Sequence, residues 1–311
     1  MVILSHYRDS GEQIEEIPFP GLSVIIPAYN EKDGISPVLH KTLDVLAHLP
    51  GPTELLVVDD GSTDETAFLA DEIDGVRVMR HRFNRGYGAS LKTGIRHARY
   101  PLICITDADG TYPNERIPDL LECILQHDAD MAVGARVGEN VAVLLVRKPA
   151  KWMIQQLGQF VANEKIPDIN SGLRIFKRSA VTPFLSILPS TFSFTTTITL
   201  AMLTNGYQVE FLPINYFARV GKSKIRPIHD TVNFFLLVTR IALYFVPLKI
   251  FLPLSGMLLV LAAIWGFYSW SVLGRLADVS TLIITLAAFQ IAVLGMLAEL
   301  INRRLSGFHR G

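Results

Sequence analysis

The sequence has few cysteines and no excess of charge of either sign. Only two of its 311 residues are cysteine, and 29 basic side chains are matched by 29 acidic ones. Two cysteines cannot form the disulfide framework of a small secreted protein. A neutral chain also lacks the bulk attraction to nucleic acid that a basic protein has. Because Cys104 and Cys123 both occur in apolar segments, we expect them to be buried thiols.

The N-terminus has no long hydrophobic run. Residues 1–16 contain neither the apolar core nor the small-residue cleavage site of a secretory signal. We therefore expect that the first domain is not exported. Charged residues make up 19% of the chain and hydrophobic residues 50%, a composition that excludes a disordered protein.

Charge is almost absent from the C-terminal region. Twenty-five uncharged residues lie between Lys249 and Arg275, and 20 more lie between Asp278 and Glu299. A helix needs about 20 apolar residues to cross a bilayer, and the link between the two runs is short. The pattern predicts a helical hairpin that spans a membrane twice. The alternative is a pair of helices buried in a soluble core.

Basic side chains flank the open end of this hairpin. Lys249 precedes the first run, and Arg303, Arg304 and Arg310 follow the second. Basic residues beside membrane spans favour the cytoplasmic side. We therefore expect an integral membrane protein whose large domain and both termini are cytoplasmic.

The chain divides into four predicted parts. They are an N-terminal extension at 1–20, an α/β domain at 21–226, an amphipathic juxtamembrane helix at 227–248, and two transmembrane helices with a tail at 249–311. The apolar stretch before the first span is an alternative third span, against which Arg240 and Pro247 argue.

Strand-like and helix-like segments alternate in the first part of the chain. This alternation predicts a mostly parallel sheet with helices on both faces. The predicted strands are 22–26, 55–58, 76–79, 102–106 and 131–133, and the predicted helices are 35–49, 64–73, 88–98 and 115–126.

Polar or glycine-rich clusters follow four of these strands. Ligands bind beyond the carboxyl ends of parallel strands in such sheets. Asp107 and Asp109 follow the fourth strand, and in an extended backbone residues i and i+2 face the same way. Two carboxylates that converge on one point suit Mg²⁺ bound to a diphosphate. A turn with two solvated acids is the plainer alternative.

The motifs VIIPAYNE, VVDDGSTDET, NRGYGAS and TDADGTYP occur in this order, followed by DINSGLRIF, ARVGKSKI and the two spans. With this set the chain resembles glycosyltransferase family 2, with the GT-A fold, over roughly residues 20–301. The last three features resemble the polyprenyl-phosphate hexosyltransferases, such as the dolichyl-phosphate mannose synthases.

The resemblance implies an enzyme. It would be an inverting hexosyltransferase that depends on Mg²⁺ or Mn²⁺ and moves glucose or mannose from UDP-glucose or GDP-mannose to a polyprenyl (dolichol-type) phosphate. Its partners would be the donor, the lipid acceptor and the bilayer, with no nucleic acid; association of several copies is left open. The alternatives are a processive polysaccharide synthase, whose Gln-x-x-Arg-Trp motif is missing, and a non-catalytic membrane adaptor with a nucleotide-sugar pocket.

The resemblance also implies residue roles. Asp107 and Asp109 would hold the metal, and Asp168 would act as a base, orient the acceptor or brace its loop. Thr111 departs from the Gln often found there in dolichyl-phosphate mannose synthases, so a third metal ligand is not assigned. The implied nucleotide-sugar-binding residues are Pro27, Tyr29, Asn30, Glu31, Asp59, Asp60, Ser62, Asn84, Gly86, Asp107, Ala108 and Asp109.

The acceptor itself calls for positive side chains. A phosphate monoester is largely anionic at neutral pH, so the protein must hold one anion close to another. A loop at 219–224 with a central glycine is placed to close over the substrate; simple attraction to anionic lipid is the alternative. The expected acceptor-phosphate residues are Arg136, Arg174, Arg219, Lys222, Ser223 and Lys224.

Overall fold

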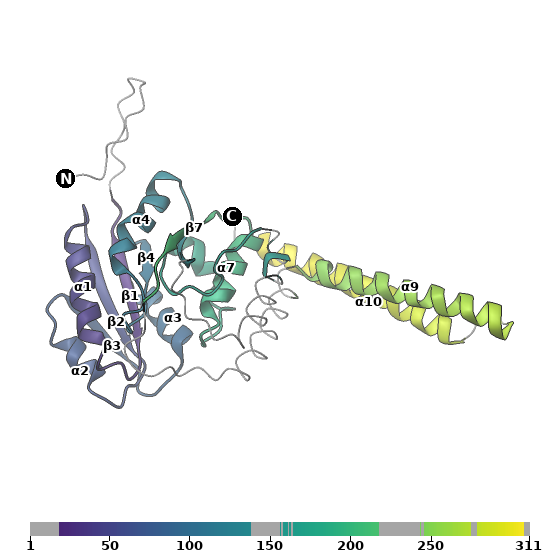
Figure 1. Ribbon diagram of the computed structural model, residues 1–311, viewed down its shortest axis with the longest axis horizontal. Helices are drawn as coiled ribbons and strands as arrows, with labels where there is room; N and C mark the ends of the chain where they lie inside the picture. The colour runs from purple at the N-terminus through teal and green to yellow at the C-terminus, as the bar shows by residue number, and fades with distance from the viewer. Residues whose placement is uncertain are drawn as a thin grey trace, which may run out of the picture.

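The computed structural model describes an α/β domain and a long helical hairpin that projects from it (Figure 1). The described residues are 19–137, 156, 158–160, 162, 164–217, 243, 246–274 and 279–307. The extension before residue 19 and most of the predicted juxtamembrane helix lie outside these residues, so both stay predictions.

The predicted order of strands and helices is confirmed through residue 136. The elements are β1 (Leu22–Ala28), α1 (Ile35–Ala47), β2 (Thr53–Asp59), α2 (Thr66–Asp71), β3 (Val76–Arg80), α3 (Tyr87–His97), β4 (Leu102–Ile105), η1 (Asn114–Arg116), α4 (Ile117–Gln126) and β5 (Met131–Arg136). The chain continues with β6 (Arg174–Lys177), α6 (Arg178–Val181), η3 (Thr182–Phe184), α7 (Phe194–Thr204), β7 (Val209–Ile214), α9 (Pro247–Leu273) and α10 (Val279–Gly307).

The sheet has seven strands in the order β3-β2-β1-β4-β6-β5-β7. β1, β2, β3 and β4 are parallel, as are β5 and β7. Neither β6 nor β7 was predicted from the sequence. β6 runs antiparallel to both of its neighbours, which makes the sheet mixed rather than wholly parallel.

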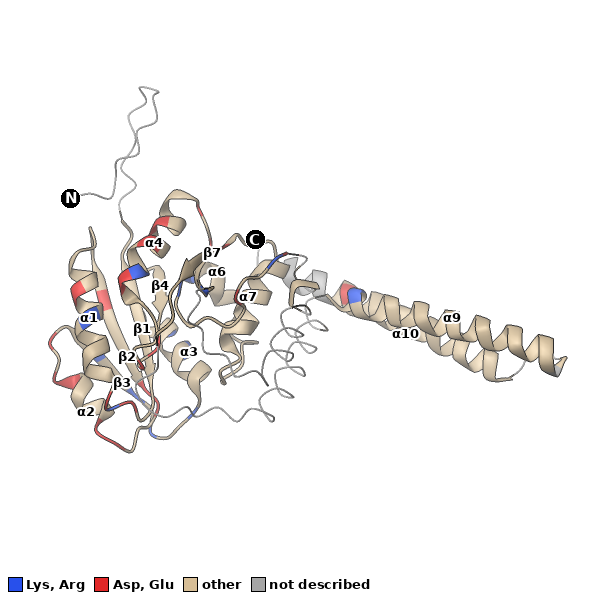
Figure 2. Ribbon diagram, viewed as in Figure 1, with Lys and Arg blue, Asp and Glu red and all other residues tan. Residues whose placement is uncertain are grey.

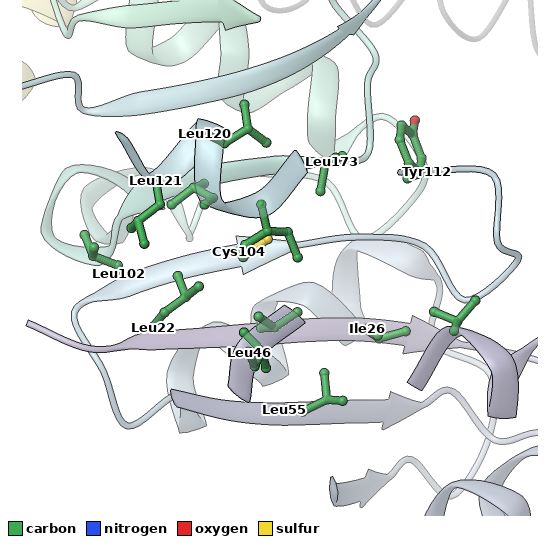
Figure 3. Close-up of a cluster of buried hydrophobic side chains, with 14 of the residues drawn as sticks. Leu22, Ile26, Leu46, Leu55, Leu102, Cys104, Tyr112, Leu120, Leu121 and Leu173 are labelled. Atoms are coloured by element: carbon green, nitrogen blue, oxygen red, sulfur yellow. The ribbon is translucent and has the colours of Figure 1, made fainter. Parts of the chain in front are cut away.

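Both faces of the sheet are covered by helices, as predicted. Successive side chains of a strand point to opposite faces, and β1 accordingly contributes Ile25 to one core and Val24 and Ile26 to the other. Residues of α3 and α7 complete the first core, and residues of α1 and α4 complete the second, which Figure 3 shows. Cys104 and Cys123 are free and buried, which confirms the prediction for both thiols.

The hairpin consists of two helices long enough to cross a membrane. Pro247–Val272 and Val279–Ile301 meet this description by length and composition, and only 11% of each apolar stretch is buried. A helix of 27 residues is roughly 40 Å long, more than the ~30 Å hydrocarbon core. Among the described residues of the hairpin, charged residues occur only at the end near the α/β domain (Figure 2). The two helices are therefore not buried in the core of the described domain, unlike the soluble helical pair considered as the alternative.

Small residues let the two helices approach each other. The Ser255 hydroxyl donates a hydrogen bond of 2.8 Å to the Ala288 carbonyl oxygen, and both residues are buried. A Cβ atom added to Gly295 would lie 2.5 Å from Cβ of Phe251, whereas one added to Gly256 would meet nothing within 4 Å. Close packing at small residues is the usual way in which membrane helices associate.

We expect Gly295→Ala to destabilise the hairpin and Gly256→Ala to leave it unchanged or more stable. Ala is favoured over Gly by about 1 kcal/mol in a helix, but at position 295 the contact with Phe251 opposes this gain with an overpacking cost of about 1–3 kcal/mol. The stability of each variant is measured by thermal unfolding of the full chain in detergent, with circular dichroism as the signal. Equal midpoints for the two variants would contradict the packing described.

Candidate active site

The loops after β1 and β2 are interlocked at the carboxyl end of the sheet. The Asn30 amide donates to Ser62 Oγ (2.9 Å), and the Thr63 amide donates to Asn30 Oδ1 (2.8 Å). Asn30 has φ +50°, a left-handed conformation that Asn adopts more readily than most residues. The structure therefore brings together the first two predicted clusters; Pro27 is buried, whereas Tyr29, Asn30, Glu31 and Ser62 are partly exposed.

Asp60 joins the second cluster to the third. Its buried carboxylate accepts hydrogen bonds from the amides of Arg85 (2.9 Å) and Gly86 (2.8 Å), and lies 2.7 Å from Nδ1 of His81. Asp60 is only 3% exposed. Because its partners are groups of the protein, Asp60 fits a structural role in shaping the loop before α3. The predicted contact of Asp60 with the nucleotide does not fit this position. The His81 side chain is only 6% exposed and is ordered by Asp60.

Asp59 has an oxygen that no described residue satisfies. Its Oδ2 accepts from the Ser62 amide at 3.2 Å, whereas its Oδ1 is buried without a hydrogen-bond partner among the described residues. An unsatisfied buried acceptor costs about 1–3 kcal/mol. This cost would be removed if a ligand supplied an N–H or O–H group, which suits the role predicted for Asp59, and that role stays a prediction.

Gly86 packs against the protein rather than opening space for a nucleotide. It has φ +99°, and a Cβ atom there would lie 2.3 Å from the Ser190 carbonyl oxygen. Residues 190–191 thus lie against the side of Gly86 where a Cβ atom would stand, and the nucleotide contact of Gly86 stays a prediction. Asn84, two residues earlier, is exposed and remains available.

Asp107 and Asp109 lie beyond the end of β4 at Ile105. Because the chain turns at residues 108–109, the continuous extended geometry assumed from the sequence is wrong. Asp107 Oδ1 accepts from the Tyr87 hydroxyl (2.9 Å), and Asp109 Oδ1 accepts from the Thr111 hydroxyl (2.7 Å). Asp109 and Ala108 are buried and Asp107 is partly exposed.

These partners hold the two carboxylates in place. Burial, followed by the charge of Asp107, raises the pKa of Tyr87 well above its ordinary value, so the hydroxyl stays a donor at neutral pH. Two carboxylates at a strand end are the oxygen donors that Mg²⁺ and Mn²⁺ take together with phosphate and water. The donor set therefore fits a hard divalent cation.

The DINSG motif lies beside this turn. A Cβ atom on Gly172 would be 2.9 Å from Asp107 Oδ2, and the Gly172 amide donates to the Tyr112 hydroxyl oxygen at 2.6 Å. Only a glycine lets the chain pass this close to the carboxylate. Two motifs more than 60 residues apart in the sequence thus form one site.

Asp168 is engaged by Arg136. The guanidinium makes two hydrogen bonds to the carboxylate, of 2.6 Å from Nε and 2.9 Å from a terminal nitrogen. Burial would raise the pKa of Asp168, but the hydrogen bonds and charge of Arg136 outweigh it and hold the pKa below its ordinary value. A carboxylate this stable is a poor proton acceptor, so the geometry favours the bracing role over that of a base.

Arg174 does not lie where an acceptor phosphate can reach it. Its side chain is 0% exposed, and its guanidinium donates to the Thr195 carbonyl oxygen (3.1 Å), Thr199 Oγ1 (2.9 Å) and the Ser171 carbonyl oxygen. Burial lowers its pKa to about 10, so it remains charged at neutral pH. The expected phosphate contact is replaced by a charge that holds the loop before β6 against α7.

Four further candidates lie outside the described residues. They are Arg219, Lys222, Ser223 and Lys224, and their predicted contact with the acceptor phosphate stays a prediction.

Two family models match the chain. The model of glycosyl transferase family 2 matches residues 23–183, and the model of the GtrB C-terminal hairpin matches residues 246–303. The first covers the sheet as far as η3, including all four strand-end clusters. The second covers the apolar stretches of both long helices.

Curated relatives match over about half of the chain. An undecaprenyl-phosphate 4-deoxy-4-formamido-L-arabinose transferase of Klebsiella pneumoniae is 33% identical over 190 residues, 57% of this chain and 57% of the relative. A dodecaprenyl-phosphate galacturonate synthase of Rhizobium johnstonii is 28% identical over 165 residues, 51% of this chain and 48% of the relative. The matched part thus spans less than two thirds of either relative.

Solved structures share the fold. A glucosyl-3-phosphoglycerate synthase of Mycobacterium tuberculosis, crystallised with Mn²⁺, UDP and its product, superposes with a TM-score of 0.56 at 19% identity. The match covers 76% of this chain and 85% of that one. At this identity the likeness concerns the fold alone, and it confirms the expected GT-A architecture.

We expect Asp60→Asn to lower the free energy of unfolding by about 1–3 kcal/mol, because an amide group would face N–H donors that now meet a carboxylate. Asp71→Asn is the control, since Asp71 pairs with Arg80 at the surface and such pairs contribute at most about 1 kcal/mol. Thermal unfolding of both full-length variants gives the comparison. An Asp60 variant as stable as the Asp71 variant would contradict the bracing role.

Proposed function

Since the chain belongs to glycosyl transferase family 2, we propose that it transfers a sugar from a nucleotide donor to the phosphate of a polyprenyl lipid. The observation that carries the proposal is the combination of strand-end carboxylates with a hairpin long enough to cross a membrane. Both curated relatives are named for a polyprenyl phosphate, which supports a lipid acceptor of this kind.

The donor nucleotide would bind across the ends of β1, β2 and β4. The unpartnered Oδ1 of Asp59 would accept an N–H group of the base or a ribose hydroxyl, which is chemistry that carboxylates perform in a buried site. Glucose on UDP and mannose on GDP remain the proposed donors. The relatives named above act on other sugars, so the donor is the part of the proposal that experiment must decide.

Asp107 and Asp109 would hold Mg²⁺ or Mn²⁺ beside the donor diphosphate. A divalent cation bound there would neutralise the charge that develops on the departing diphosphate. The protein's own contribution is to hold these carboxylates ready through Tyr87 and Thr111. Such preorganisation removes reorganisation from the reaction itself.

A displacement with inversion needs no strong base here. An oxygen of the acceptor phosphate would bond to the anomeric carbon while the sugar–diphosphate bond breaks and its electron pair leaves with the diphosphate. The phosphate is already anionic at neutral pH, so no proton must be removed first. This agrees with Asp168 being occupied by Arg136.

The acceptor phosphate would be held mainly by Arg219, Lys222 and Lys224, with Ser223 as a further donor. Arg136 is only 17% exposed and its charge is matched by Asp168, so its contribution would be partial. We further propose that the hairpin crosses the membrane with both ends on the cytoplasmic side, next to the acceptor's headgroup.

A donor panel tests the activity. Purified full-length protein in detergent would be incubated with a short prenyl phosphate, Mg²⁺ or Mn²⁺, and UDP- or GDP-linked sugars including UDP-glucose and GDP-mannose, and the lipid product would be read by mass. We expect one sugar to appear on the lipid. Nucleotide-sugar binding without any lipid product would favour the non-catalytic adaptor, and a growing polymer would favour a processive synthase.

We expect Asp109→Asn to lower kcat at least about 100-fold, in the range seen when an electrostatic contact to the transition state is removed. Asp128→Asn, at a surface ion pair with Lys177, is the control and should keep full activity. A variant at Asp109 with unchanged turnover, or turnover that persists in excess EDTA, would refute the metal-dependent mechanism.

We expect Arg219→Ala to raise KM for the prenyl phosphate by about 10-fold or more, because a hydrogen bond to a charged group contributes about 1.5–3 kcal/mol. KM for the nucleotide sugar should stay within about twofold. Arg96→Ala, which removes an exposed basic side chain at the end of α3, is the matched control. An effect confined to the donor would show that Arg219 serves the other substrate.

A further inference from the structure

A second cluster of metal-ligating side chains lies away from the strand-end carboxylates. Cys123 is on α4, His127 follows the last turn of this helix, and Glu210 is on β7. One ligand atom from each of the three lies within 4.8 Å of the other two. Nothing in the proposed transfer reaction uses them.

The fold itself brings these residues together. Positions i and i+4 of a helix share one face, which aligns Cys123 with His127. β7 pairs with β5, and Glu210 is registered with Ala132, whose side chain belongs to the core that α4 covers. The loop after α4 is tied to β7, since Gln208 donates to the His127 carbonyl oxygen (3.2 Å) and to Asp130 Oδ2 (3.0 Å).

The ligand set differs in kind from that of the strand-end site. Asp107 and Asp109 offer oxygen only, as Mg²⁺ and Mn²⁺ prefer. Cys123, His127 and Glu210 offer sulfur, nitrogen and oxygen, which is the mixture that Zn²⁺ takes. Three protein ligands leave a fourth position for water.

The distances fit a tetrahedral ion after a small movement. Bonds of about 2.0–2.3 Å place tetrahedral ligand atoms roughly 3.3–3.8 Å apart. His127 Nδ1 and Glu210 Oε2 are 2.9 Å apart, and their side chains are 56% and 29% exposed, so an ion can enter from solvent and both can adjust. The side chains of His127 and Glu210 would have to move by about 1 Å, which exposed side chains do freely.

Other roles of the thiol fit less well. Burial first, then the hydrogen bond and charge of Glu210 and the charge of Glu122, raise the pKa of Cys123 to about 11. A thiol of this kind is a weak nucleophile and oxidises slowly. Cys123 is also a free cysteine, so no disulfide occupies it.

We propose that Cys123, His127 and Glu210 form a binding site for zinc or another thiophilic divalent metal, with water as the fourth ligand. On binding, the thiol proton is released to solvent, and any proton on His127 Nδ1 that is donated to Glu210 leaves this nitrogen as well. The sulfur and the ring nitrogen then form bonds to the metal, with no change of oxidation state. The ion would fasten β7, an edge strand of the sheet, to α4. β7 ends at Ile214, which pairs with Arg136, so the ion would stabilise the strand beside Arg136.

Cobalt substitution tests the site on the full-length protein in detergent. After chelation and removal of the chelator, Co²⁺ would be added and the thiolate-to-cobalt charge-transfer absorption recorded. We expect this band to saturate at one Co²⁺ per chain and to be displaced by Zn²⁺ but not by excess Mg²⁺. Cys123→Ser should abolish it, and Glu210→Gln should weaken Co²⁺ binding at least tenfold.

The controls separate this site from the others. His48→Asn removes an exposed histidine that likewise ends a helix, α1, but that has no cysteine beside it, and it should bind Co²⁺ as the unchanged protein does. Asp109→Asn should also keep the band, so failure of the transferase proposal leaves this test intact. Zn²⁺ should raise the melting temperature of the unchanged protein more than that of Glu210→Gln.

Three results would overturn the proposal. They are the absence of the charge-transfer band in the unchanged protein, its persistence in Cys123→Ser, or equal Co²⁺ affinity in the unchanged protein and Glu210→Gln. The last comparison decides the matter even if Cys123→Ser does not fold.

Discussion

The hydrogen bonds that Asp60 accepts hold the site together. They join the end of β2 to the loop before α3 through the amides of Arg85 and Gly86, and they order His81. α3 begins with Tyr87, whose hydroxyl in turn holds Asp107. A buried carboxylate of the second cluster therefore positions a carboxylate of the fourth, through a helix that belongs to neither.

Charge inside the domain is arranged in pairs or held by the backbone. Asp168 is matched by Arg136, and Arg174 is surrounded by carbonyl and hydroxyl oxygens. Burying an unpaired charge is costly, so these residues do not present free charge to a substrate. The positive groups that an incoming phosphate needs would then come from other residues, and we propose the segment 219–224, which is basic by composition.

The chain is adapted to two different solvents. The α/β domain buries both faces of its sheet, whereas the hairpin exposes apolar side chains along most of its length. Within the hairpin, contacts at Ser255 and Gly295 take the place of a hydrophobic core. In a bilayer, apolar burial between helices gains little, so close packing and hydrogen bonds must hold them together.

Periodicity, run length and motif order are local properties of the chain. They were enough to predict the elements up to β5, the hairpin and the grouping of polar clusters at strand ends. The pattern did not predict β6, which is short and antiparallel, or β7, and it offered a turn at residues 107–109 only as the alternative to an extended chain. Only the folded structure showed which charged residues are buried among protein partners. From the sequence, Arg174 and Asp60 were predicted to contact ligands. In the structure both are buried, because Arg174 binds Thr199 and Asp60 binds the amide of Gly86, which are distant in the sequence. The physical reason is that the cost of burying a polar group depends on partners that the fold supplies, and the local sequence does not record them.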